Sequence, residues 1–118
     1  MKSITIFDVV LVPFPFADLK AAKQRPCLVL AKVSPQRLED HFIVAMITSQ
    51  LGEQSLRFPS DVLLKQHDGA GLPKPSLVRL SKVVTLETAL IRKKLGSLQS
   101  LDRRLVRQQF RFLFSELV

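Results

Sequence analysis

The side chains in this sequence that could do chemistry together are one arginine and two neighbouring hydroxyls, each beside an apolar run. Arg25 comes just before the run Cys27–Leu30, and Thr48-Ser49 closes the run His41–Thr48. A guanidinium can hold a phosphate through a fork of hydrogen bonds and stabilise the charge that develops on it, while a hydroxyl can donate to a non-bridging oxygen. RNA supplies its own nucleophile, the 2′-OH. These residues would therefore suit phosphodiester chemistry without a metal or a protein nucleophile.

Two strands would have to bring these groups to one rim of the fold. Both apolar runs are rich in β-branched residues, which predicts buried strands. Pro26 has no N–H, so we expect it to be the first residue of its strand, and it biases Arg25 toward an extended conformation. Guanidinium and hydroxyl then meet if the two strands are sheet neighbours with suitable directions. Spacing alone leaves an alternative, in which Arg25 is an ordinary loop charge and Thr48 bonds only to the backbone.

Other kinds of catalytic site have less support in the sequence. His41 and His67 lie far apart, Cys27 is the single cysteine, and no H-x-x-x-H or C-x-x-C motif exists, so we expect no metal site. Cys27 lies inside an apolar run and is predicted to be a buried structural thiol rather than a nucleophile. His67 belongs to a His-Asp-Gly loop, where an exposed turn competes with a role in proton transfer. Neither a glycine-rich phosphate loop nor a serine nucleophile elbow is present.

The composition favours an anionic partner. The chain has 18 Lys and Arg against 10 Asp and Glu, which gives a formal net charge of +8. Such an excess suits RNA, DNA, an anionic membrane or an acidic protein, although it also serves solubility. The N-terminal apolar stretch is interrupted by Asp8 and Pro13, and it is too short to span a membrane. With one unpaired cysteine, we expect a cytoplasmic protein without membrane association.

The chain is long enough for one domain, which we place at residues 1–118. Short strands with close turn signals predict a mainly β fold, either a small barrel or a strongly bent sheet covered by a helix. The predicted strands are Val9–Val12, Cys27–Leu30, His41–Thr48, Asp61–Leu64 and Ser76–Thr85, and Glu87–Lys94 is ambiguous between a strand and a helical turn.

The C-terminal segment has a different period. From Ser100 to Leu117 apolar residues recur every three to four positions, which predicts an amphipathic helix. Phe112 and Phe114 extend the apolar surface beyond what one face needs, and this surplus is typical of a surface that packs on a partner subunit.

Several short motifs, in order along nearly the whole chain, resemble the MazF/PemK family of toxin endoribonucleases. They are Asp8–Phe16, Arg25–Leu30, Ile47–Ser49, Lys74–Leu80 and Lys94–Leu98. The resemblance implies an SH3-like barrel of about six to seven strands that forms a homodimer. It also implies sequence-selective cleavage of single-stranded RNA, typically mRNA, without a cofactor. The 2′-OH attacks the adjacent phosphate and leaves a 2′,3′-cyclic phosphate and a 5′-OH. A cognate acidic antitoxin would block the RNA groove.

The resemblance also assigns roles to residues. The family's catalytic arginine maps onto Arg25 and its threonine onto Thr48. Asp18 resembles an acidic position found after the first strand in PemK-like members, so it is the first candidate for the general base, with His67 second. The residues expected to bind RNA are Lys20, Lys23, Gln24, Ser49, Gln50, Arg79 and Lys82.

The chain departs from the family pattern at several positions. Phe7 replaces the usual glycine before the first strand, Ser81-Lys82 replaces an acidic residue and glutamine, and Val84 replaces an arginine. The region Lys20–Gln24 has no glutamate. Two alternatives therefore stay open beside the nuclease: a non-catalytic nucleic-acid-binding barrel, and a protein-interaction module with an SH3-like groove.

Overall fold

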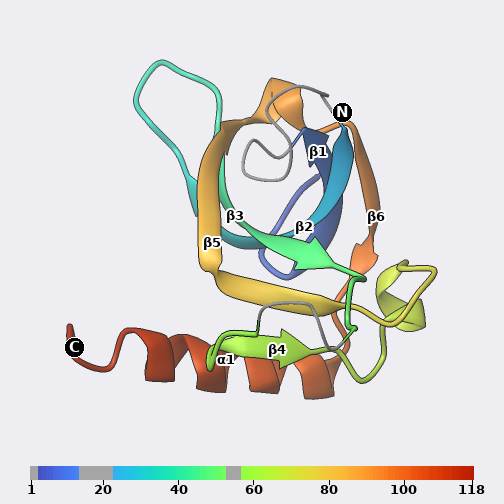
Figure 1. The fold of residues 1–118 in the computed structure, drawn as a ribbon. Helices are drawn as coiled ribbons and strands as arrows, with labels where there is room; N and C mark the ends of the chain where they lie inside the picture. The colour runs from blue at the N-terminus through green and yellow to red at the C-terminus, as the bar shows by residue number, and fades with distance from the viewer. Residues whose placement is uncertain (1–2, 14–22, 53–56) are drawn as a thin grey trace.

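The computed structural model describes residues 3–13, 23–52 and 57–118. Within them six strands form one antiparallel sheet in the order β4-β5-β3-β2-β1-β6, and one helix follows (Figure 1). The mainly β class with a C-terminal helix is confirmed. The elements are β1 (Asp8–Pro13), β2 (Gln24–Val33), β3 (His41–Thr48), β4 (Asp61–Leu63), the 3₁₀ turn η1 (Asp68–Ala70), β5 (Leu77–Glu87), the 3₁₀ turn η2 (Thr88–Leu90), β6 (Lys93–Ser97) and α1 (Ser100–Leu113).

The sheet curls strongly but does not close into a barrel. In Figure 1 the strands β1, β2 and β3 and the upper part of β5 wrap around a common interior. The edge strands are β4 and β6, and no strand pairing joins them in the part of the chain that the structure describes. Of the two predicted arrangements, the structure has the strongly bent sheet covered by a helix, and the closed barrel that the family resemblance implied is not formed by the described residues. The turn η1 packs against β6 and so lies at this open side.

The strand β5 has a sharp bend that separates two parts of the sheet. Its pairing with β3 jumps from Arg79 opposite Met46 to Val83 opposite Ala45. The residues between Arg79 and Val83 therefore have no pairing partner on β3, and such a bulge bends and twists a strand. The first half of β5 pairs with β4 near α1, while the second half continues the curved wall (Figure 1).

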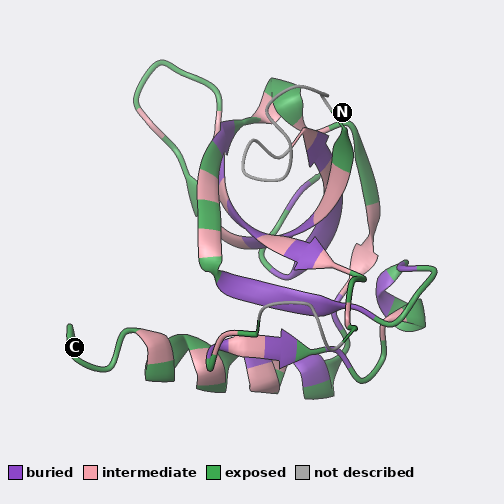
Figure 2. Ribbon diagram, viewed as in Figure 1, coloured by how far each residue is buried: buried purple, intermediate pink, exposed green. Residues whose placement is uncertain are grey.

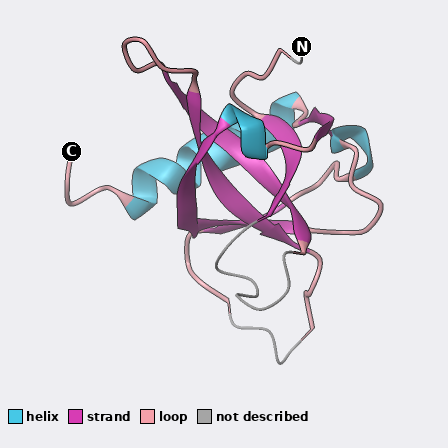
Figure 3. Ribbon diagram, turned by 90° about the horizontal axis from the view of Figure 1, so that it is seen from above, coloured by secondary structure: helices cyan, strands magenta, loops and turns pink. Residues whose placement is uncertain are grey.

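Two apolar clusters pack on opposite faces of the sheet. Val9 and Leu28 belong to one cluster, whereas Val10 and Cys27 belong to the other, as the alternation of side chains along a strand requires. Val106 of α1 joins the first cluster, so the helix covers that face. Figure 2 shows the buried residues concentrated on the strands, with the outer side of α1 exposed. Seen from above, α1 crosses one side of the curved sheet (Figure 3).

A buried carboxylate fixes the first turn of α1 to the segment after β4. Asp102 is fully buried and accepts hydrogen bonds from the backbone N–H groups of Lys65 at 2.8 Å and Gln66 at 2.9 Å. Hydrogen bonds to a charged acceptor are among the stronger ones, so this contact ties two distant segments together. The helix ends at Leu113, before the expected Leu117. Among the described residues, no helix has both the length and the apolar character needed to cross a membrane.

Phe7 adopts a backbone conformation that favours glycine. Its φ is 70°, in the left-handed region that a side chain disfavours. Its ring is only 6% exposed, and the guanidinium carbons of Arg103 and Arg107 lie 5.3 and 4.8 Å from its centroid. Ring burial and these cation–π contacts offset the backbone strain. A glycine, which the resemblance predicts at this position, would adopt this conformation without strain. This chain instead has an aromatic side chain here that anchors α1.

Candidate functional site

The beginning of β2 and the end of β3 border one hollow of about 340 Å³. It is also bordered by β1, by β6 and by the segment between η1 and β5. The described lining residues are Leu11, Arg25, Pro26, Ile47, Thr48, Ser49, Gln50, Leu72, Pro73, Lys74, Ser76 and Leu95. The structure thus brings Arg25 together with Thr48, Ser49 and Gln50, four of the residues that the sequence nominated for the site.

The register of the sheet explains this juxtaposition. The strands β2 and β3 are antiparallel neighbours, and Cys27 is paired with Met46. In such a pair, each step back along one strand is a step forward along the other. Arg25 precedes Cys27 and Thr48 follows Met46, so both residues lie at the same end of the two strands, just past the last β2–β3 pair. The two strands are therefore sheet neighbours and run in opposite directions, which is the condition for the guanidinium and the hydroxyl to meet at one rim.

Arg25 is held in the part of β2 that extends beyond β3. It is paired with Val12 of β1, whereas the pairing of β2 with β3 begins only at Cys27. Pro26 is not the first residue of the strand, as the sequence suggested, because β2 already begins at Gln24. It nevertheless lies where β2 has no β3 neighbour, which suits a residue that cannot donate a ladder hydrogen bond. The pairing between β2 and β3 thus stops two residues from Arg25.

The guanidinium of Arg25 has unused hydrogen-bonding capacity. Its Nε is buried and has no hydrogen-bond partner among the described residues. A buried N–H without an acceptor is unfavourable, so a bound oxygen would be stabilising there. A phosphate oxygen is the acceptor that best matches a guanidinium fork.

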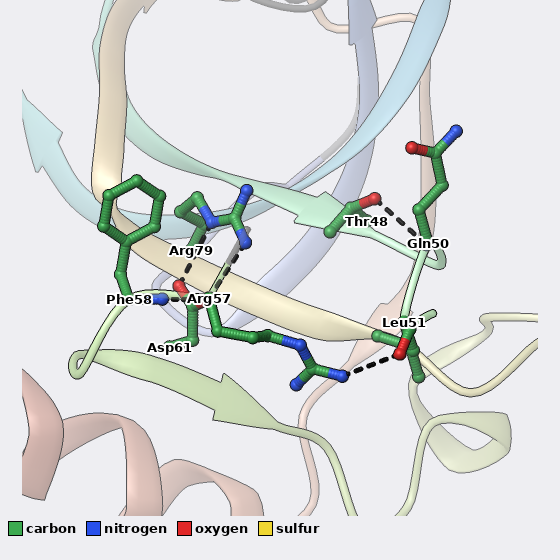
Figure 4. Close-up of polar contacts among 7 residues, drawn as sticks. All are labelled: Thr48, Gln50, Leu51, Arg57, Phe58, Asp61 and Arg79. Atoms are coloured by element: carbon green, nitrogen blue, oxygen red, sulfur yellow. Dashed lines mark hydrogen bonds and ion pairs between the residues drawn. The ribbon is translucent and has the colours of Figure 1, made fainter. Parts of the chain in front are cut away.

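Thr48 is oriented by a local turn. The backbone N–H of Gln50 donates to Thr48 Oγ1 at 3.1 Å (Figure 4). This contact uses the oxygen as an acceptor, which leaves the hydroxyl proton available for donation to a bound group. Ser49 and Gln50 are exposed beside it and add further polar groups at the rim.

The remaining predicted site residues lie elsewhere or cannot be placed. Lys23 and Gln24 are exposed directly before Arg25 but do not line the hollow. Lys82 lies in the bulge of β5, away from the lining. Asp18 and Lys20 lie outside the described residues, so their roles stay predictions.

Arg79 is part of a buried ion pair. It is 7% exposed and lies opposite Asp61 in the pairing of β4 with β5. Its Nε and Nη2 donate to Asp61 at 3.2 and 3.0 Å, and its guanidinium lies 4.8 Å from the ring centroid of Phe58 (Figure 4). These contacts hold β4 on β5, and Arg79 does not line the hollow. Contact with RNA, which the sequence suggested for Arg79, stays a prediction.

A family model described as the PemK-like, MazF-like toxin of type II toxin–antitoxin systems matches residues 6–114. The chain belongs to this family. No sequence among the curated proteins matches it.

Solved structures of toxins from this family share the fold. The Mycobacterium tuberculosis toxin MazF-mt6 superposes with a TM-score of 0.66 at 18% identity, covering 92% of this chain and 96% of that one. A mycobacterial endoribonuclease, solved with its cognate antitoxin, gives a TM-score of 0.68 at 14% identity and covers 96% of each chain. A Deinococcus radiodurans MazE-MazF structure gives 0.63 at 19% identity and covers 97% of each chain. At these low identities, the TM-scores establish that the folds are alike.

The hollow also contains residues that sequence reasoning did not nominate. Leu72, Pro73, Lys74 and Ser76 lie far from Arg25 in sequence, yet they line the same hollow. The available signal was the motif Lys74–Leu80, which entered only as part of the family resemblance. Nothing in the local sequence indicates that this loop reaches β2 and β3.

Cys27 is not equipped for nucleophilic chemistry. It is fully buried and unpaired, and burial raises the pKa of its thiol well above the ordinary value. The thiolate is the reactive form of cysteine, so a thiol that resists ionisation is inert. The predicted structural role of Cys27 is confirmed. Within the described ranges, no cluster of three or more His, Cys, Asp or Glu side chains could hold a metal ion.

Proposed function

We propose that this chain is the toxin of a toxin–antitoxin pair and acts as a sequence-selective endoribonuclease on single-stranded RNA, typically mRNA, without a metal. The observation that carries the proposal is that Arg25 and Thr48 line one hollow, with a buried guanidinium N–H that has no acceptor among the described residues. Family membership supports the same reaction, because MazF-type toxins include proteins named as endoribonucleases.

In the proposed reaction the RNA supplies the nucleophile. The 2′-oxygen attacks the adjacent phosphorus, the bond from phosphorus to the 5′-oxygen breaks, and the products are a 2′,3′-cyclic phosphate and a 5′-OH. Arg25 would hold the non-bridging oxygens and stabilise the charge that builds up on them. Thr48 would donate its hydroxyl proton to one of these oxygens. The proton of the 2′-OH passes to a general base, for which Asp18 is our candidate, and the leaving 5′-oxygen takes up a proton.

The partners follow from the same surface. We propose that Lys20, Lys23, Gln24, Ser49 and Gln50 bind the RNA strand around the hollow. A cognate acidic antitoxin fits the net charge of +8, and two of the similar structures are described as toxin–antitoxin complexes. A homodimer would cover apolar surface on α1, where Phe110 and Phe112 are 43% and 56% exposed.

The test is cleavage of a long single-stranded RNA with and without EDTA, with the ends of the products mapped. We expect cutting at short preferred sequences in EDTA, with cyclic-phosphate and 5′-OH ends. Arg25→Ala should reduce the rate by about 10²–10³-fold, the usual effect of removing a donor to the transition-state oxyanion. Arg25→Lys should also be impaired because it loses the planar fork. The matched control is Arg104→Ala, which removes the same charge from an exposed position on α1.

Three results would overturn the proposal: cutting that disappears on chelation, cutting that survives Arg25→Ala unchanged, or no cutting at all. Salt-sensitive binding of RNA without cleavage would instead select a non-catalytic binding protein.

A further inference from the structure

The segment between η1 and β5 contributes a second cation to the hollow. We propose that Lys74 binds a second phosphate of the RNA strand, next to the phosphate held by Arg25. The inference rests on the proposed function and extends it with a binding residue that the sequence did not nominate. It is carried by three features: a rigid backbone under Lys74, a backbone contact that fixes this segment to β6, and an unbalanced positive charge.

The backbone around Lys74 is held firmly although its side chain is exposed. Pro73 and Pro75 flank it and fix their own φ angles. The hydroxyl of Ser76, a buried residue, donates to the carbonyl oxygen of Lys74 at 2.8 Å. The side chain of Leu72 is buried at 3% exposure. Lys74 therefore extends from a pre-positioned anchor, and binding through it loses less conformational entropy than binding through a residue on a free loop.

A close contact between two glycines fixes this segment to β6. Gly71 has a φ of 82°, and a Cβ on it would lie 2.1 Å from the carbonyl oxygen of Leu95. A Cβ on Gly96 would lie 2.5 Å from the carbonyl oxygen of Ala70. Because only glycine permits this approach, the chain before Lys74 packs directly on the strand that also contributes Leu95 to the hollow. The position of Lys74 relative to the hollow is thus set by backbone packing.

The positive charge of the hollow is not neutralised by acidic residues of its described lining. Its described lining contains two cations, Arg25 and Lys74, and no acidic residue. A few cations of the described chain pair with carboxylates, as Lys32 does with Asp40 and Lys94 with Asp8. Arg25 and Lys74 are among those without an ion pair in that part of the chain. Two uncompensated cations at one concave site attract a ligand with more than one negative charge.

The two cations suit different tasks. A guanidinium matches the geometry of one phosphate through two hydrogen bonds, whereas an ammonium on a flexible stem acts as a point charge that tolerates several geometries. Arg25 therefore suits the reacting phosphate, and Lys74 suits a neighbouring phosphate of the same strand. Binding at a non-reacting phosphate orients the strand so that the correct 2′-OH faces the correct phosphorus.

The experiment measures binding separately from cleavage. The probe is a single-stranded oligonucleotide that lacks 2′-OH groups, so it presents phosphates but cannot react. Binding is followed by fluorescence anisotropy over a series of salt concentrations. Lys74→Gln is compared with Lys65→Gln, which removes the same charge from an exposed lysine that does not line the hollow. Lys74→Arg keeps the charge. Urea unfolding of each variant confirms that the fold is intact.

We expect Lys74→Gln to weaken binding about tenfold, in line with the loss of one hydrogen bond to a charged group. The slope of log K against log salt should fall by about 0.7 because one phosphate contact is lost on a single strand. Lys65→Gln and Lys74→Arg should stay close to the unmodified chain. Equal affinity and slope for Lys74→Gln and Lys65→Gln would overturn this inference alone, provided that the unmodified chain cleaves RNA. A chain that neither binds the probe nor cleaves RNA would overturn the proposed function as well.

Discussion

Phe7 offers a direct test of how this chain compensates for a strained backbone. The test compares Phe7→Ala with Phe7→Gly. Both variants lose a ring that is 6% exposed and contacted by two guanidinium groups. Removing a buried phenylalanine side chain lowers the free energy of unfolding by about 3–5 kcal/mol. This is a large part of the stability of a small domain, which is about 5–15 kcal/mol.

The difference between the two variants isolates the backbone. At an ordinary extended position, alanine is more stabilising than glycine by about 0.5–1 kcal/mol. At φ 70° the order should reverse, because a Cβ in the left-handed conformation is unfavourable by about 1–2 kcal/mol. We therefore expect Phe7→Gly to have the higher free energy of unfolding, by about 1 kcal/mol after the entropic penalty of glycine is subtracted.

The assay is urea unfolding followed by far-UV circular dichroism, with linear extrapolation of the free energy to zero urea. The slopes must agree between the variants, so that the midpoints report stability. A Phe7→Ala variant as stable as Phe7→Gly would refute the strained backbone. A loss below about 1 kcal/mol in both variants would refute the anchoring role of the ring.

Two further predictions concern Cys27 and Gly96. Cys27 should not react with Ellman's reagent in the folded protein and should react once urea unfolds the chain, because burial raises the pKa of its thiol. Stability should also fall above about pH 8.5, where the unfolded thiol ionises and the folded one does not; rapid native labelling or a flat profile would contradict this. Gly96→Ala should lower the free energy of unfolding by about 1–3 kcal/mol, since its Cβ meets the carbonyl oxygen of Ala70. Gly52→Ala, with no atom within 4 Å of its Cβ, is the control, and equal effects in urea unfolding would argue against the clash.

Local patterns in the sequence were sufficient for most individual elements. The apolar run His41–Thr48 is β3 with the predicted bounds. The segment Glu87–Lys94, which was ambiguous between a strand and a helical turn, divides into the end of β5, η2 and the beginning of β6. These features depend on hydrophobic periodicity and on glycine and proline signals, which act within a few residues.

Features set by contacts between distant segments were not accessible in this way. The burial of Arg79 depends on Asp61, which becomes its neighbour only through the register of β4 and β5. Lys74 reaches the hollow because two glycines distant in sequence let their backbones touch. Whether the two edge strands, β4 and β6, pair with each other likewise depends on the three-dimensional path of the whole sheet. By contrast, Arg25 and Thr48 could be nominated because each lies at the end of an apolar run.

The pairing of β1 with β6 affects when the fold can form during synthesis. Ser97 donates to Asp8 at 2.6 Å across 89 residues of sequence, and β1 pairs with β6 from Asp8 to Leu11. Pairings between such distant segments form slowly, because a long loop has to close before the contacts are gained. During synthesis, β1 therefore has no β6 partner until a further 89 residues have been translated. The hollow, which needs Leu11 of β1 and Leu95 of β6, is therefore completed only after β6 has been translated. Nascent chains that stop before β6 would lack it.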